Sequence, residues 1–258
     1  MKNVIITISL KYNTIRPEYL EVSKPYMIEY AKKIGADFIA ITEESEIINH
    51  IDMFEYGKIG RNNGIAYLLK IYAIYYYLAT YDMVLWLDDT CIIRQDTPNL
   101  FEMIDDNYIM AYNEGMNDEL KSWKHDMKFI QETLNYTIDR MKYINSGIVI
   151  YSNKIREYIS PDYMKKYGKL FESIYPHQAW LNYIIQSNNL SIKFLSSQYN
   201  TMFLVEGYNN IERKLEADNI VNLKKEDKIY HITGFYVNRY EIIKKVSKMI
   251  SMTPKNND

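Results

Sequence analysis

The sequence predicts an α/β protein with a mostly parallel central sheet flanked by helices. Short apolar runs of strand length alternate with segments whose apolar residues recur at helical spacing, which is the rhythm of βαβ units. The run Met83–Leu87 is apolar throughout, as expected for a strand buried on both faces. With 258 residues, 47% of them hydrophobic and 25% charged, the chain can bury a sizeable core.

In the first part of the chain, the sequence pattern predicts three strands separated by two helices. The third strand is the apolar run Met83–Leu87, after which Asp88 and Asp89 follow directly. The elements before it are a strand at 3–10, a helix opened by Arg16-Pro17-Glu18 and ended by Gly35, a strand at 37–41, a variable connection at 43–60 and a long amphipathic helix at 63–80.

In the rest of the chain, the pattern predicts further strands of the same sheet. We expect one domain at 1–250 and a disordered tail at 251–258. The predicted elements are a short helix from 98, a strand at 108–112, a charged helical insertion at 117–142, a strand at 147–151, a helix at 177–186 and a strand at 192–195, followed by a late apolar segment at 229–233. Residues 240–250 form an amphipathic stretch with lysines opposite its apolar face. Such a helix either packs on the domain or lies on an anionic membrane.

The pair Asp88 and Asp89 is the strongest local indication of a site. Ionised carboxylates are almost never buried unless they are paired or bind a metal, and ligands gather at the carboxyl ends of strands in open α/β sheets. The pair therefore predicts a divalent cation together with the phosphates that it bridges. The alternative is a solvated or helix-capping acidic pair.

Three other positions carry candidate chemistry. His231 could complete a metal site, although a lone histidine is more often a hydrogen-bonded structural residue. Lys70, nine residues after Arg61, could form a cationic clamp on phosphates, or it could be a snorkelling surface lysine. Asn145-Ser146-Gly147, at the entrance of the strand at 147–151, allows close approach of a ligand or forms an ordinary turn.

The sequence contains no glycine-rich phosphate loop and no nucleophile elbow. The patterns G-x-x-x-x-G-K-[ST], G-x-G-x-x-G and G-x-S-x-G are all absent. A nucleotide bound by this chain would therefore have to be held by a metal and cationic side chains.

Taken in order along residues 3–239, these segments resemble the GT-A glycosyltransferases, in particular the glycogenin and lipopolysaccharide galactosyltransferase-like group. The strand Val4 to Ser9 resembles the family's first strand, and the spacing of Arg61 and Lys70 resembles its donor-binding Arg and Lys. The motif-like segments are Leu85-Trp86-Leu87-Asp88-Asp89-Thr90 (D-x-D), Tyr143-Ile144-Asn145-Ser146-Gly147-Ile148 (F-N-[SA]-G-[VI]), His177-Gln178-Ala179-Trp180-Leu181-Asn182 (D-Q-x-x-L-N), Tyr199-Asn200 (Y-N) and His231-Ile232-Thr233-Gly234 (H-[FYI]-x-G).

The chain departs from the family pattern at three places. Thr90 stands at the last position of D-x-D, which leaves Asp88 and Asp89 as the carboxylates. His177 replaces the acid of D-Q. The lysine usually found after H-x-x-G is missing, and Arg239 could substitute from farther along the chain.

The resemblance implies a metal-dependent transferase that moves a sugar from a nucleotide-diphospho-sugar, a UDP-sugar, to a glycan, lipid or protein acceptor, with Mn²⁺ or Mg²⁺ as cofactor. The implied metal ligands are Asp88, Asp89 and His231. The implied donor contacts are Thr7, Ser9, Tyr12, Arg61, Lys70, Asp88, Asp89 and Gly234. The implied catalytic residues are Asp88, Lys70, Asn145, His177 and Gln178.

The stereochemistry and the reaction class each have an alternative. The resemblance slightly favours retention of configuration, whereas His177 as a general base would give inversion. A sugar-phosphate nucleotidyltransferase shares the fold, and a non-catalytic relative would bind nucleotide-sugar or glycan without turning it over.

Composition gives expectations about partners and location. The net charge of −2 gives no reason to expect a nucleic-acid partner. The lone Cys91 excludes an intramolecular disulfide and fits a reducing compartment. The sequence shows neither a signal peptide nor an apolar stretch of the roughly 20 residues that cross a bilayer. We expect a cytoplasmic protein, with peripheral membrane contact through 240–250 as an option.

Overall fold

The structure is a computed structural model that describes residues 1–10, 19–50, 64–118, 122–204, 223–233 and 239–252. Its centre is a six-stranded sheet with the strand order β2-β1-β3-β6-β5-β7. The strands are β1 (Asn3–Ile8), β2 (Asp37–Ile41), β3 (Met83–Leu87), β5 (Ile109–Asn113), β6 (Ile144–Ser152) and β7 (Ile192–Leu195). The predicted α/β class is confirmed.

Five of the six strands run in one direction. β1 is parallel to β2 and β3, and β5 is parallel to β7, whereas β6 is antiparallel to both β3 and β5. The predicted mostly parallel sheet is therefore correct, with β6 as its reversed strand. This reversal brings the amino end of β6 to the edge of the sheet where β1, β3 and β5 end.

One boundary of β6 differs from the prediction. Asn145 and Ser146 were expected at the entrance of the strand at 147–151, either to allow close approach of a ligand or as an ordinary turn, but they belong to β6, all nine residues of which are buried. The small polar residues do not break the strand because Asn145 and Ser146 find hydrogen-bond partners inside the protein.

A second, three-stranded sheet has the order β4-β9-β8. It consists of β4 (Cys91–Ile93), β8 (Thr201–Leu204) and β9 (Ile229–Thr233). β4 pairs antiparallel with β9 so that Cys91 lies opposite His231. Since Cys91 follows the Asp88–Thr90 turn directly, this pairing carries His231 to the end of β3.

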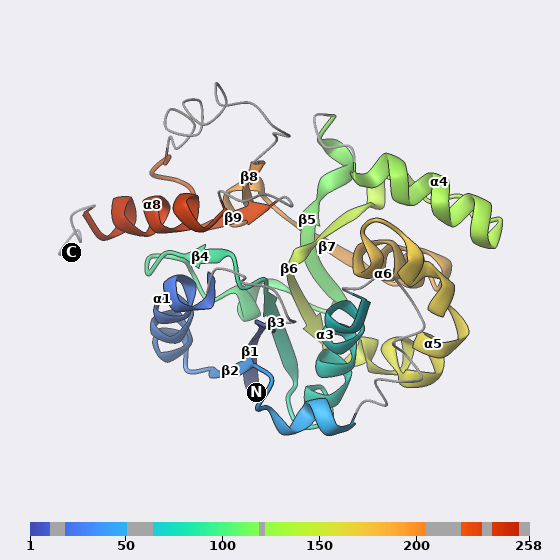
Figure 1. Cartoon of the computed structure of the whole chain (residues 1–258), viewed down its shortest axis with the longest axis horizontal. Coiled ribbons are helices and arrows are strands. Elements are labelled where there is room, and N and C mark those ends of the chain that lie inside the picture. The colour runs from blue at the N-terminus through green and yellow to red at the C-terminus, as the bar shows by residue number, and fades with distance from the viewer. Residues whose placement is uncertain (11–18, 51–63, 119–121, 205–222, 234–238, 253–258) are drawn as a thin grey trace.

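Helices cover both faces of the central sheet (Figure 1). On one face, Val4 and Ile6 pack in a core cluster with Leu68 of α3 (Gly64–Tyr77) and Trp180 of α6 (Pro176–Ser187). On the other face, Ile5 packs with the buried residues of α1 (Tyr19–Ile34). Alternate side chains of β1 thus enter opposite cores. Gly35, with φ +68°, terminates α1 as predicted.

The other helices are shorter or lie at the periphery. The α-helices are α4 (Ser122–Leu134), α5 (Pro161–Lys166) and α8 (Arg239–Met252). The 3₁₀ helices are η1 (Glu46–His50), η2 (Leu100–Met103), η3 (Glu114–Met116), η4 (Arg140–Lys142), η5 (Asn153–Ile159), η6 (Gly168–Glu172) and η7 (Ser197–Tyr199). α4 confirms the helical period predicted within 117–142, and it packs against α6 with Trp123, Asp126 and Ile130 buried.

The carboxyl-terminal helix α8 packs on the domain. Ile242, Ile243 and Val246 are buried in a cluster with Ile92 of β4 and Tyr230 of β9. The apolar face of α8 is therefore already covered by protein, which favours the packing interpretation over the membrane interpretation. Among the described residues, no helix is both long and apolar enough to cross a membrane.

We expect Ile243→Ala to lower the free energy of unfolding by about 2–5 kcal/mol, because it removes a fully buried side chain from the contact between α8 and the second sheet. Urea denaturation followed by circular dichroism measures this change. Lys248→Ala, on the exposed side of the same helix, is the control and should change stability by less than about 0.5 kcal/mol. Equal effects of the two substitutions would show that α8 is not anchored by this face.

Candidate active site

Polar residues from four strands meet at one edge of the central sheet. Ser9, Asp88 and Glu114 follow the carboxyl ends of β1, β3 and β5, and Asn145 lies at the amino end of the reversed strand β6. The backbone N–H of Asp88 donates to the carbonyl of Gly147 at 2.9 Å, which joins the end of β3 to the start of β6. The directions of the four strands therefore place these polar side chains at the same edge of the sheet.

The two carboxylate oxygens of Asp88 have different partners. Oδ1 accepts hydrogen bonds from Lys70 Nζ at 2.9 Å and from the indole Nε1 of Trp86 at 2.7 Å. Oδ2 lies 3.5 Å from Nε2 of His231. Desolvation opposes ionisation of this carboxyl, but Lys70, His231 and Trp86 together outweigh it and hold the pKa of Asp88 below its ordinary value.

Lys70 is a buried cation and not a snorkelling surface residue. The residue is 5% exposed, and Nζ donates to Asp88 and, at 2.7 Å, to the carbonyl of Ser146. Nζ also lies 4.4 Å from the centre of the Trp86 ring. Burial lowers the pKa of Lys70, whereas the neighbouring Asp88 favours the charged form. The ion pair thus joins a buried ammonium group to a carboxylate whose side chain is 36% exposed, and the buried charge of Lys70 depends on Asp88.

The Asp89 carboxylate is hydrogen-bonded to the residue that follows β1. Its Oδ2 accepts a hydrogen bond from Ser9 Oγ at 3.1 Å, and its carbonyl accepts one from Ser23 Oγ at 2.6 Å. Thr90, at the last position of the acidic motif, is buried. Within the described ranges, no three His, Cys, Asp or Glu side chains are arranged to hold a metal ion. Of the predicted metal ligands, the structure brings together Asp88 and His231.

His231 is held on three sides. Its backbone is paired with Cys91, its Nδ1 lies 3.0 Å from Oδ1 of Asn200, and its ring lies against Gly147 of β6. A Cβ on Gly147 would overlap the imidazole and lie 2.6 Å from its Nε2. Only glycine leaves room for the ring at this point, which gives the glycine of the N-S-G segment a physical reason.

Asp88 and His231 are chemically suited to a divalent cation. One carboxylate oxygen and one imidazole nitrogen are ligands that Mn²⁺-like metals accept. Their separation of 3.5 Å is close to the roughly 3 Å between adjacent ligands of a small octahedral cation. The residues present therefore fit such a cation as two of its ligands, with the remaining positions open to water or phosphate oxygens.

The predicted catalytic residues on β6 and α6 lie next to the ion pair. Oε1 of Gln178 accepts from the backbone N–H of Ser146 at 3.0 Å, and Nδ2 of Asn145 lies 3.4 Å from the same oxygen. His177 is 1% exposed, and neither of its ring nitrogens has a hydrogen-bond partner among the described residues. Burial, reinforced by the charge of Lys70, lowers the pKa of His177 well below its ordinary value.

Two buried carboxyl groups close to the Gln178 side chain were not predicted as site residues. Glu114 accepts hydrogen bonds from Asn145 Nδ2 at 2.7 Å, from Gln178 Nε2 at 3.2 Å and from Ser122 Oγ. Burial outweighs the Asn145 and Gln178 bonds and raises the pKa of Glu114 to about 7. A signal for Glu114 was available, because it lies two residues after the predicted strand at 108–112.

Asp126 of α4 is the second buried carboxyl group. It accepts hydrogen bonds from Tyr143 OH and Ser173 Oγ, both at 2.6 Å, and Gln178 Nε2 in turn donates to Tyr143 OH at 3.0 Å. Burial raises the pKa of Asp126 to about 7 as well. It lies in a charged, helical stretch, where nothing in the sequence distinguishes a buried aspartate from a solvated one.

The remaining predicted donor contacts are only partly described. Thr7 is fully buried in β1, and its Oγ1 has no hydrogen-bond partner among the described residues. Ser9 is half-buried and bonded to Asp89. Tyr12, Arg61 and Gly234 lie outside the residues that the structure describes.

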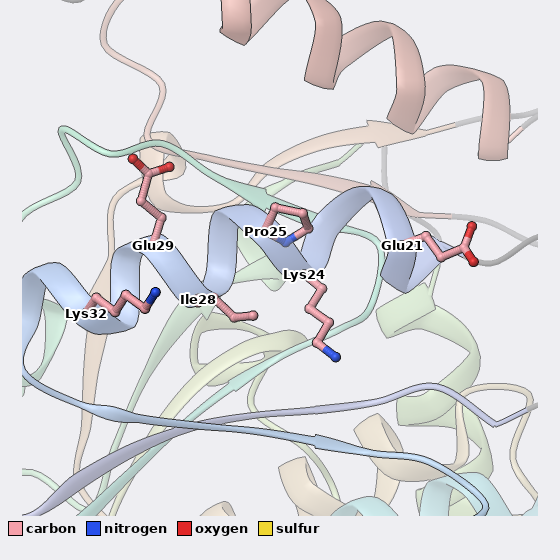
Figure 2. A pocket seen from close by; sticks show the side chains of 6 residues that line it. All are labelled: Glu21, Lys24, Pro25, Ile28, Glu29 and Lys32. Carbon is pink, nitrogen blue, oxygen red and sulfur yellow. The ribbon is translucent and has the colours of Figure 1, made fainter.

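A hollow on the outer side of α1 is separate from these residues (Figure 2). Its lining alternates acidic and basic side chains around Pro25 and Ile28: Glu21, Lys24, Glu29 and Lys32. It contains none of the predicted site residues, and its mixed charges select no class of ligand.

No protein-family model and no curated protein sequence matches the chain. Among solved structures, the chain is similar to the galactosyltransferase LgtC in complex with donor and acceptor sugar analogues, at 14% identity and a TM-score of 0.58, with 98% of each chain covered. It is also similar to the apo form of mouse xyloside xylosyltransferase 1, at 12% identity and a TM-score of 0.54, covering 90% of this chain and 97% of that chain.

A third similar structure is a glycosyltransferase involved in the glycosylation of the major capsid of PBCV-1, at 13% identity and a TM-score of 0.55, covering 95% of this chain and 100% of that chain. These neighbours are glycosyltransferases of the GT-A fold. The predicted GT-A fold is confirmed. At these identities the likeness establishes the fold and leaves the activity to be argued from the site.

We expect Gly147→Ala to displace the His231 ring, because the added methyl group would occupy its position. The Cε1–H resonance of His231 in a proton NMR spectrum should shift, and stability should fall by about 1–3 kcal/mol. Ser152→Ala, at the far end of β6, is the control, since it removes only a hydrogen bond to the carbonyl of Tyr108. An unchanged His231 resonance in Gly147→Ala would contradict the close packing.

The raised pKa of Asp126 gives stability a pH dependence. The folded state holds this proton more tightly than the unfolded chain, in which the ordinary value is 3.8, so the free energy of unfolding should fall as pH rises from about 4 to about 7. Glu114 acts in the same direction between about 4.5 and 7.

Asp126→Asn should remove part of this slope, on the order of a few kcal/mol over the whole pH range, because an amide does not titrate. The fold should tolerate the amide, since the two partners of Asp126 are hydroxyls that can reorient. Urea denaturation at several pH values measures the slope. Asp106→Asn, whose carboxylate is 98% exposed, is the control. If Asp126→Asn kept the wild-type slope, Asp126 would not be the group that holds the proton.

Proposed function

We propose that this chain is a metal-dependent glycosyltransferase that moves a sugar from a UDP-sugar donor to a glycan, lipid or protein acceptor. The observation that carries the proposal is the meeting of Lys70, Asp88 and His231 at the carboxyl end of β3, on a GT-A fold. A buried ammonium group, together with a carboxylate oxygen and an imidazole nitrogen that can bind a metal, suits a diphosphate better than an uncharged molecule.

The proposed metal ligands are Asp88 and His231, with Asp89 available after a rotation away from Ser9. A bound Mn²⁺ or Mg²⁺ would act as a Lewis acid toward the departing diphosphate. Lys70 supplies a fixed positive charge that needs no reorganisation during the reaction, because its position is set by Asp88 and the Ser146 carbonyl. Trp86 covers this ion pair and keeps Oδ1 of Asp88 occupied, so Oδ2 remains free for the cation.

The nucleotide would lie over the ends of β1 and β3. Thr7 and Ser9 are the described candidates for contacts with the base and ribose, of which Thr7 is fully buried in β1 and Ser9 is half-buried. Tyr12, Arg61 and Gly234 stay predictions. Asn145 and Gln178, on the opposite side of Lys70, would line the sugar or acceptor side.

The environment of His177 favours retention of configuration. A general base must reach the proton that it removes and must have a suitable pKa. His177 is almost fully buried, and its pKa is well below the ordinary value, so it is a poor base for an incoming hydroxyl. In a retaining reaction no dedicated base is needed on the acceptor, and His177 would serve as a neutral wall of the sugar pocket.

The location of the protein stays a prediction. A cytoplasmic protein remains our expectation from the sequence. Peripheral membrane contact through α8 receives no support from its buried apolar face.

Calorimetric titration of UDP tests the donor site. We expect the wild type to bind UDP with Mn²⁺ present and much more weakly after chelation. Loss of an outer partner of a metal ligand weakens metal binding by roughly 10–100-fold. Because Asp88 is proposed as a direct ligand, Asp88→Asn should weaken Mn²⁺-dependent UDP binding by more than this. Asp106→Asn makes the same chemical change at an exposed position and should bind as the wild type does.

The outcomes separate the competing functions. Binding of UDP followed by release of free sugar from a UDP-sugar would support a transferase. Pyrophosphate release from a nucleoside triphosphate and sugar phosphate would indicate a nucleotidyltransferase instead. If UDP bound without turnover of any donor, the chain would be a binding protein, and if no nucleotide bound with or without Mn²⁺, the proposal would be wrong.

A further inference from the structure

A continuous series of hydrogen bonds joins His231 to the buried carboxyl group of Glu114. His231 Nδ1 lies 3.0 Å from Asn200 Oδ1, and Asn200 Nδ2 donates to Asn145 Oδ1 at 3.1 Å. Asn145 Nδ2 then donates to Glu114 Oε2 at 2.7 Å. All four side chains are at least nine-tenths buried, so the donor and acceptor at each step have to match.

The direction of this series is fixed by the backbone of Gly147. Its N–H, which can only donate, points to Asn145 Oδ1 at 3.0 Å. The oxygen of Asn145 is therefore the acceptor at this end, and its NH₂ group faces the carboxyl of Glu114. A reversed Asn145 amide would set a donor against the Gly147 N–H and an oxygen against Glu114, which leaves buried groups unsatisfied.

The orientation of Asn145 determines that of Asn200. Asn145 Oδ1 requires a donor from Asn200, so Nδ2 of Asn200 must face it. The oxygen of Asn200 then faces the His231 ring. Since an amide oxygen only accepts, Nδ1 of His231 must carry a proton.

A neutral imidazole with its proton on Nδ1 has a lone pair on Nε2. This lone pair faces Oδ2 of Asp88 across 3.5 Å, and the carboxylate oxygen is also an acceptor. Two acceptors that face each other across this distance call for a cation between them. An additional proton on Nε2, which makes the ring an imidazolium that stabilises the ionised Asp88, or a metal cation would fill this position.

We propose that Asn145 and Asn200 are positioning residues that hold His231 in its Nδ1–H tautomer and keep the Nε2 lone pair directed at Asp88. The inference rests on the proposed function only for the use of this lone pair as a metal ligand. The tautomer itself follows from the hydrogen bonds and can be measured without metal or nucleotide.

Proton-coupled ¹⁵N NMR of the histidine side chains tests the tautomer in the full, chelator-treated chain. At about pH 9, above the ordinary range of imidazole, we expect a protonated Nδ1 and a bare Nε2 for His231. His231→Gln assigns its signals among the four histidines of the chain. An Nε2–H tautomer, or an even mixture of the two, would overturn the proposal.

Substitutions of Asn200 test its role. Asn200→Leu removes the acceptor, so the Nε2–H tautomer should become populated and Mn²⁺ alone, followed by electron paramagnetic resonance, should bind about 10–100-fold more weakly. Asn200→Asp loses the bond to Asn145 but keeps an acceptor opposite Nδ1, and it should retain the Nδ1–H tautomer. Loss of that tautomer in Asn200→Asp would contradict the proposal.

Asn182→Leu is the matched control, because Asn182 is an equally buried asparagine that bonds to the backbone of Ile144 and lies outside the series. It should lower stability and leave the tautomer unchanged. If Asn200→Leu does not fold, the wild-type spectrum and Asn200→Asp still decide the question. A correct tautomer without UDP binding would refute the proposed function alone, and UDP binding with the Nε2–H tautomer would refute the positioning role alone.

Discussion

The buried charge of Lys70 is the constraint on which the candidate site depends. An ammonium group removed from water is stable only beside an opposite charge and further hydrogen-bond acceptors, and Lys70 finds both in Asp88 and the Ser146 carbonyl. These bonds tie α3 to the end of β3 and the start of β6. They also occupy Oδ1 of Asp88, so its second oxygen is free to face His231.

The sequence alone was sufficient for much of the fold. Strands such as Asp37–Ile41 and Ile192–Leu195 have the predicted bounds, because they are short apolar runs between turn residues. The reversed direction of β6 and the separate β4-β9-β8 sheet were not predictable in this way. An apolar run has no direction, and the partner of β4 lies far along the chain.

The candidate site was predictable where a residue follows a strand or interrupts an apolar helix face, as with Asp88 and Lys70. Asn200 was visible only as part of a short motif, since its role depends on two amides and an imidazole that meet from distant segments. Asp126 carries no such mark, because its buried partners, Tyr143 and Ser173, come from other segments of the chain. Local pattern thus identifies the residues that touch the ion pair better than those that support them.

The pairing of β9 with β4 also has a consequence for biosynthesis. The first three strands of the central sheet, Lys70 and Asp88 leave the ribosome well before β9, so an ordered ion pair can exist while His231 has yet to be made. The nascent chain then holds Asp88 against Lys70 with no imidazole opposite. The two proposed metal ligands would therefore come together only when β9 pairs with β4.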